Sequence, residues 1–233
     1  MRVALVTLVA ALAVLALGVT PASAAARECQ GLMICVPRIG PWVVVPTDTS
    51  EGEPKVEYQM TCPRGYVVGG VWADLSQRAI DVTFIGALGS PVNPGVTTSR
   101  SVTFVARFVG SASRAPTFRP RIGCMPASGG GIRIPTAATA FPPGKPTVRR
   151  VRNASVRPGT ATVSRSCIGR ERIVAASHAF GFYTSKPPQA GLVASVSGTS
   201  SIEGNQATAR VSGDAELGGV RATVQVQAIC SVS

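Results

Sequence analysis

The sequence predicts an all-β protein with two tandem, disulfide-closed repeats of β-sandwich or barrel-like form after a signal peptide. Three observations predict this fold class. Short stretches of alternating apolar and polar residues are separated by Gly- and Pro-rich turns. Outside the signal, no segment keeps apolar residues at helical spacing, so we expect very little helix. A segment that begins at Thr61 also recurs about a hundred residues later, at Ser166.

The recurring segment reads TCPRGYVVGGVWA in the first copy and SCIGRERIVAASHA in the second. Each copy passes from a cysteine through apolar residues to a pair of small residues, Gly69-Gly70 or Ala175-Ala176. It then reaches a ring side chain, which places His178 at the position equivalent to Trp72. Glycines inside a strand predict a bulge or a close backbone approach at Gly69-Gly70.

Six cysteines in an exported chain predict three disulfides. Equivalent cysteines of the two copies should pair in the same way, which predicts Cys62–Cys124 and Cys167–Cys230 and leaves Cys29–Cys35. The alternative is a zinc site, but the chain has no C-x-x-C motif and a single histidine. We therefore predict neither a metal nor another cofactor.

The order of segments along the chain follows from composition. A positive Arg2, an apolar stretch and the small residues Ala22-Ser23-Ala24 predict a secretory signal over residues 1–24. A membrane anchor is the alternative, but the apolar stretch is short, and no later stretch reaches the length of a membrane span. We expect a secreted protein that can associate with the cell wall. The remaining segments are an N-terminal disulfide loop (25–41), repeat 1 (42–125), a Gly/Pro/Ala/Thr-rich linker (126–146) and repeat 2 (147–233).

The clearest strand of the second repeat is predicted over residues 220–230. Valine and alanine side chains alternate there with polar ones, so that the apolar set lies on one face. Arg221, Thr223, Gln225 and Gln227 lie on the other face. The same two-residue period over residues 55–62 places Val56 on a face with two further apolar residues.

No catalytic constellation is recognisable, so we expect no enzymatic activity. Hydrolytic triads need a base, which is most often histidine. His178 is the one candidate, with Asp214 as a conceivable partner, but no G-x-S-x-G motif supports a nucleophile. A packing role at the Trp72 position is the favoured interpretation. Asp214 and Glu216 share a Gly-rich turn, which favours a solvated hairpin over a glycosidase pair.

The charge balance is strongly basic, with a formal net charge of +12, and residues 125–166 carry seven basic and no acidic side chains. Arginine clusters bind phosphates and anionic polymers. Nucleic acid is disfavoured as a partner because no stacking aromatic lies between Phe141 and Phe180. A solvated strand edge that blocks aggregation is the simpler alternative. The candidate anion-binding residues are Arg149, Arg150, Arg152 and Arg157.

Two similar loops are a second candidate site. PVNPGV and PPQAGL share Pro and Gly positions and lie in the middle of their repeats. Loops on a rigid sheet often carry binding functions, although a shared turn explains the same pattern. The candidate ligand-binding residues are Pro91, Asn93, Gly95, Pro187, Gln189 and Gly191.

The start of the first repeat, C-P-x-G-x-x-V-x-G-G over residues 62–70 with its later isolated cysteine, resembles uncharacterised secreted proteins of GC-rich Gram-positive bacteria. The resemblance implies export and a β fold, and it supplies no catalytic residue. The second repeat departs from it, with Cys167-Ile168-Gly169 in place of Cys-Pro-x-Gly.

These observations predict a secreted, non-catalytic β protein that binds an anionic cell-envelope polymer or a lipid surface. Two other classes stay open. One is an extracellular enzyme or enzyme inhibitor, and the other is a structural extracellular protein with no ligand. The sequence does not determine the oligomeric state or how the two repeats pack.

Overall fold

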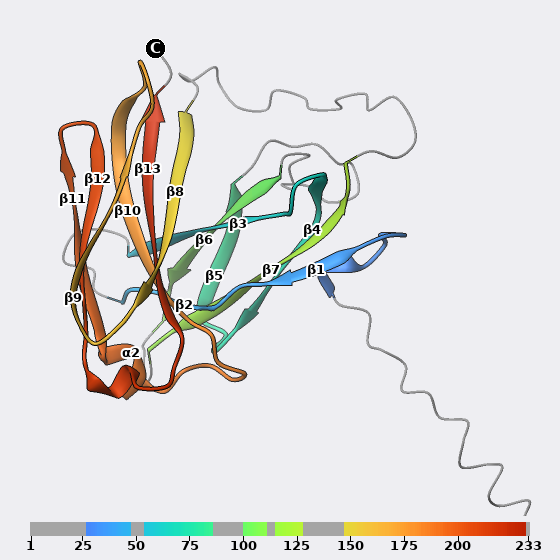
Figure 1. Ribbon diagram of the computed structural model, residues 1–233. Helices are drawn as coiled ribbons and strands as arrows, with labels where there is room; N and C mark the ends of the chain where they lie inside the picture. Colours follow the sequence, from blue (N-terminus) through green and yellow to red (C-terminus); the bar gives the residue numbers. More distant parts are fainter. Residues whose placement is uncertain (1–26, 48–53, 86–99, 111–114, 128–146, 232–233) are drawn as a thin grey trace, which may run out of the picture.

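The computed structural model is almost entirely β (Figure 1). The predicted all-β class is confirmed in its sandwich-like form, because the sheets do not close into a barrel. The predicted signal peptide lies outside the described residues, as does most of the predicted linker. The structure describes residues 27–47, 54–85, 100–110, 115–127 and 147–231.

The first unit consists of two facing sheets. In one sheet, β4 (Tyr66–Leu75) pairs with one side of β7 (Thr117–Pro126), while β1 (Val36–Ile39) and β2 (Trp42–Val44) pair in succession with its other side. The facing sheet has the order β3-β6-β5. Its strands are β3 (Lys55–Thr61), β6 (Ser101–Phe108) and β5 (Ile80–Ile85). A 3-10 turn, η1 (Arg27–Cys29), precedes β1.

The second unit repeats this plan. In one sheet, β13 (Ala222–Ser231) lies between β10 (Arg172–Phe182) and β8 (Thr147–Val156). The facing sheet has the order β11-β12-β9. Its strands are β9 (Gly159–Ser166), β11 (Val196–Glu203) and β12 (Gln206–Gly213). Two short helical turns, α2 (Ala190–Ala194) and η2 (Ala215–Leu217), lie in its connections.

The two units have the same strand order. The set β3-β6-β5 corresponds to β9-β12-β11, and the pair β4–β7 corresponds to β10–β13. Along β7, strands β1 and β2 occupy the place that β8 occupies along β13. A β-bulge interrupts the long pair at the same point in both units, at Gly69 in β4 and at Val174 in β10. Such agreement is what the predicted duplication requires.

A disulfide joins the two sheets of each unit. Cys62 directly follows β3 and is bonded to Cys124 in β7, and Cys167 directly follows β9 and is bonded to Cys230 in β13. The third disulfide, Cys29–Cys35, closes a short loop before β1. All three predicted pairings are therefore present. Each long bridge closes a loop of more than 60 residues and, on the loop-entropy model, stabilises its unit by roughly 4 kcal/mol.

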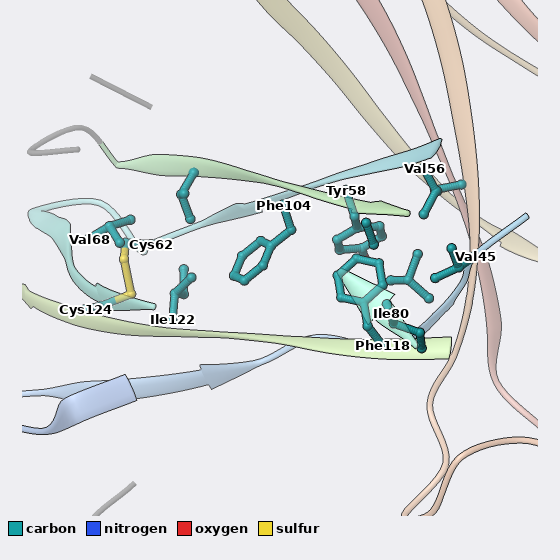
Figure 2. Close-up of a cluster of buried hydrophobic side chains, with 14 residues drawn as sticks. Val45, Val56, Tyr58, Cys62, Val68, Ile80, Phe104, Phe118, Ile122 and Cys124 are labelled. Atoms are coloured by element: carbon teal, nitrogen blue, oxygen red, sulfur yellow. A yellow bond between two sulfur atoms is a disulfide. The ribbon is translucent and has the colours of Figure 1, made fainter. Parts of the chain in front are cut away.

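Each unit has its own apolar core between its sheets. In the first, aromatic rings from opposite sheets meet: the Phe104 and Phe118 ring centroids are 6.3 Å apart, and both side chains are fully buried. Figure 2 shows this core, with the Cys62–Cys124 disulfide at one end and Val45 at the other. The second core has smaller side chains, largely Val and Ala from β12 and β13.

Strand β1 corrects the predicted organisation, because it lies inside the segment 25–41 that the sequence presented only as a disulfide loop. All four of its residues are exposed. Among the described residues it has β7 on one side and no strand on the other, and because neither of its faces is buried, nothing requires apolar alternation. Its conformation is set by backbone pairing, from Val36 opposite Cys124 to Ile39 opposite Arg121.

Several contacts join the units within the described residues, including a continuous sheet and a polar contact. The sheet is continuous because Val43 of β2 pairs with Phe118 of β7 on one side and with Gly181 of β10 on the other. In the polar contact, the outer face of β13 packs on the free edge of β3. The side chain of Gln225 accepts a hydrogen bond from Gln59 N (2.6 Å) and donates one to Gln59 O (3.0 Å).

A second glutamine extends this polar contact. Gln227 donates to Glu57 O (3.0 Å) and to the Gln225 side chain (2.9 Å), while its own oxygen accepts from Arg149. Arg149 also forms an ion pair with the Glu57 carboxylate. Both glutamines are fully buried, and these bonds satisfy the edge of β3 that faces the second unit.

The N-terminal turn covers the outer face of the first unit. The Glu28 carbonyl oxygen lies so close to the sheet that a Cβ atom at Gly70 would be 2.0 Å away from it, and one at Gly123 would be 2.2 Å away. The close backbone approach predicted at Gly69-Gly70 therefore has a partner, which is the backbone of η1.

A Gly70→Ala substitution should consequently destabilise the protein, because the new methyl group overlaps a backbone atom that cannot rotate away. We expect a loss of about 1–3 kcal/mol in the free energy of unfolding, measured by urea denaturation. Gly191→Ala is the matched control: its nearest neighbour, Glu216 Oε2, is 3.5 Å away and its backbone is helical. The account of η1 is wrong if both variants have wild-type stability.

Candidate functional site

His178 is partly buried in the second unit, on the core-facing side of β10. It pairs with Val226, a fully buried core residue, and its ring packs edge-on against Phe180 with centroids 5.4 Å apart. Burial lowers the pKa of the imidazole below its ordinary value of 6.5, while a hydrogen bond with the Gly198 backbone acts in the opposite direction. Desolvation therefore favours the neutral imidazole, and the ring packs against an aromatic side chain.

The predicted equivalence of His178 and Trp72 is wrong by one residue. Trp72 pairs with Arg121, which lies three residues before Cys124. In the second unit, the residue three before Cys230 is Gln227, and its partner is Ser177. Trp72 lies on the outer face of its sheet, where the guanidinium of Arg27 stacks 4.8 Å from its ring. The sequence comparison missed the shift because the second copy has one more residue between its cysteine and its ring.

The described carboxylates near the candidate residues have structural roles. Asp214 caps η2, since its side chain accepts from Glu216 N (2.8 Å). Asp74 accepts from Arg121 Nε (2.7 Å) on the outer face of β4. Both Asp214 and Glu216 are exposed in this turn, but it is not the predicted hairpin, because it connects β12 and β13, which belong to different sheets.

One group of possible metal-ligand atoms occurs in the described part of the chain. The sulfur atoms of Cys167 and Cys230 and a carboxylate oxygen of Glu171 lie within 4.8 Å of one another. The two sulfurs form the disulfide of the second unit, so neither offers a thiolate. A single carboxylate does not make a metal site.

The structure does not gather the four predicted arginines on one surface. Neighbouring residues of β8 point to opposite faces, so Arg149 lies against the first unit, bound to Glu57, while Arg150 lies on the core side of the strand. Arg152 is on the same side as Arg150, and its Nη1 donates to Ser164 O (3.4 Å). Arg157 follows the end of the strand and is exposed.

Arg150 and Arg152 lie instead beside arginines that the sequence did not single out. Strands β8 and β9 pack against each other at one edge of the second sandwich. On β9, Arg165 pairs with the core residue Ala207 and so has its side chain on the inner side of the sheet. Its Nε is buried, with no hydrogen-bond partner within the described residues. Three arginines thus share this edge.

A recess with a volume of about 670 Å³ lies at the end of the second unit where Cys167 follows β9. Asn205 at the β11–β12 turn builds it: its side chain accepts from Ile173 N (2.8 Å) and donates to Glu171 O (2.9 Å). The recess is lined by Gly169, Arg170, Glu171, Arg172, Ile173, Gly204 and Asn205.

Glu171 is held in place within the recess. Arg150 donates to both of its oxygens, and Ile168 N donates to one of them at 2.9 Å. The bond from Arg150 is the main reason that the pKa of Glu171 is below its usual value. Arg152, Arg165 and Arg172 form no ion pair with a carboxylate in the described residues. We call Arg150, Arg152, Arg165, Arg170, Glu171 and Arg172 the arginine recess.

Only the second of the two candidate ligand-binding loops lies within the described residues. Pro91, Asn93 and Gly95 lie outside the described residues. In the second loop, Pro187, Gln189 and Gly191 are exposed. Gly191 belongs to α2, because Gln189 O accepts from Val193 N (3.1 Å), so a single helical turn replaces part of the predicted loop.

The arginine recess was detectable only in part from the sequence. The turn after Cys167 reads IGRER, which shows two arginines beside a glutamate. Nothing in the sequence indicates that Asn205, more than thirty residues later, completes the site, because that contact is between two loops. In the sequence, Arg165 resembles any polar residue of an edge strand. Its position near other arginines depends on the packing of β8 against β9, which the sequence does not show.

None of the described helices is long and apolar enough to span a membrane. Comparisons with protein families, with curated proteins and with solved structures found no significant match to this chain.

The environment of His178 predicts a specific dependence of stability on pH. Because its folded-state pKa is lowered, the unfolded chain binds a proton more readily, so this residue reduces stability as the pH falls below about 6.5. His178→Gln should lack this contribution, whose slope is at most about 1.4 kcal/mol per pH unit. Urea denaturation of both proteins between pH 7.5 and 5 checks this. Parallel curves for the two proteins would contradict the buried, neutral ring.

Proposed function

We propose that this protein is an exported, non-catalytic binding protein that holds an anionic polymer of the cell envelope at the arginine recess. The observation that carries the proposal is the concentration of arginines around one concave site, where Arg152, Arg165 and Arg172 form no ion pair with a carboxylate of the described residues. Arg170 and Arg172 line the hollow itself with Glu171, which is already bound by Arg150, and Arg152 and Arg165 lie on the adjoining strand edge. Guanidinium groups are well suited to phosphate and carboxylate groups, which they bind in a bidentate manner.

The shape of the site favours an extended ligand over a small anion. Arg170 and Arg172 line the recess, while Arg152 and Arg165 continue along the β8–β9 edge next to it. A polymer with a charge on each repeating unit can contact both parts in one bound state. The buried Nε of Arg165 is a donor without a partner, so an acceptor atom there would satisfy it.

Export is supported by the use of cysteine. All six cysteines are in disulfides, and such bonds form in oxidising compartments outside the cytosol. The proposed signal in residues 1–24 agrees with this location. A non-catalytic role is supported by His178, whose partly buried ring packs edge-on against Phe180.

The proposal is tested with two polyanions of different chemistry, polyphosphate and polygalacturonate. The oxidised chain without residues 1–24 should bind at least one of them at low salt, and binding should weaken as salt is added. Arg165→Gln combined with Arg172→Gln should weaken binding by about tenfold and reduce the slope of log K against log salt by about one to two. The two polymers distinguish a phosphate-bearing ligand from a carboxylate-bearing one.

The matched control is Arg78→Gln combined with Arg210→Gln. These two arginines are exposed and removing them changes the net charge equally, but they lie outside the recess. Equal weakening in the two double variants would show that net charge, and not the recess, causes binding. Failure of the wild type to bind either polymer would also overturn the proposal.

A further inference from the structure

The loop closed by Cys29–Cys35 presents apolar side chains to solvent. Met33 is fully exposed and Ile34 is 64% exposed. Val36 and Ile39, on the strand that follows, are exposed by 38% and 45%. In Figure 1 this loop projects from the molecule at the start of β1, away from the second unit. We call Met33 and Ile34 the apolar tip.

The apolar tip is held firmly at its base. Besides the disulfide, Leu32 N donates to Cys29 O (3.1 Å), and the Leu32 side chain packs over Gly69, where a Cβ would be 2.9 Å from its Cδ1. The Glu28 backbone is seated on Gly70 and Gly123. Leu32 therefore anchors the loop, while the next two side chains point outward. A tip that is already ordered loses little conformational freedom when it binds.

The surroundings of the apolar tip are basic. Strand register places the tip and the turn at Arg64 beyond the same end of β7, since Val36 pairs with Cys124 and Tyr66 with Pro126. Arg64 is exposed at this end, while Arg38, opposite Ile122, and Arg27, over the Trp72 ring, are exposed further along the same sheet. The nearby Glu28 is buried and its carboxylate is 3.7 Å from Arg121, so it does not offset these charges at the surface.

We propose that the apolar tip inserts into the surface of a lipid membrane with anionic headgroups, as a second binding site that does not depend on the arginine recess. Two side chains on a narrow loop are too small for a stable protein interface, which buries about 1,200–2,000 Å². A small apolar anchor beside basic residues suits an anionic lipid surface. The apolar anchor or the basic residues alone would bind such a membrane weakly, and the two together bind it stably.

The test is cosedimentation of the oxidised chain without residues 1–24 with phosphatidylglycerol/phosphatidylcholine vesicles and with pure phosphatidylcholine vesicles. We expect binding to the anionic vesicles, and a loss of about tenfold or more for Met33→Ser combined with Ile34→Ser. Ile168→Ser combined with Val174→Ser is the matched control, because these apolar residues are exposed by 56% and 54% on the second unit. That control and the recess variant Arg165→Gln with Arg172→Gln should both bind as the wild type does.

Fluorescence gives a second readout. Met33→Trp should show a blue shift with anionic vesicles, and Ile168→Trp should not. The proposal is overturned if the tip variant binds as well as its control, if the wild type binds neither kind of vesicle, or if the Met33→Trp emission stays unshifted. Loss of vesicle binding in the recess variant would instead assign the lipid contact to the arginine recess. Each variant's melting temperature should match that of the wild type, since all the altered apolar residues are exposed.

Discussion

Two buried glutamines determine how the halves of this molecule sit together. The edge of a β-sheet carries backbone groups that must be paired, covered or left in water. On β3 this edge faces the second unit, where Gln225 provides both a donor and an acceptor to Gln59, as a neighbouring strand would. Without these amides, the backbone of β3 would be buried against apolar side chains at a cost of about 1–3 kcal/mol for each unsatisfied group.

The polar contact also explains a difference between the two units. The outer face of the first unit's long sheet is covered by η1, which requires glycine at Gly70 and Gly123. The corresponding face of the second unit is covered by the first unit, so it has glutamines where the first has Arg119 and Arg121. Each unit therefore has, on this face, the side chains that fit its own cover. The arginine recess and the apolar tip lie on different units, in regions that neither cover occupies.

The sequence was sufficient for the parts of the fold that depend on local pattern. Alternation over residues 220–230 predicted β13, and matched cysteine spacing predicted the disulfide pairs. It placed Gln225 and Gln227 on the polar face of that strand, but what covers this face lies more than 160 residues away. Likewise, Arg149 looked like a free cation because its partner Glu57 comes from the other unit. Contacts between distant segments leave no periodic signal.

The central claim is that the shared sheet and the Gln225–Gln227 contact make the two units one cooperative structure. The most direct measurement is differential scanning calorimetry of the oxidised chain and of the double variant Gln225→Ala, Gln227→Ala. We predict a single wild-type transition whose calorimetric and van't Hoff enthalpies agree, and a split into two transitions in the variant. Two resolved transitions in the wild type, or one unchanged transition in the variant, would contradict the claim.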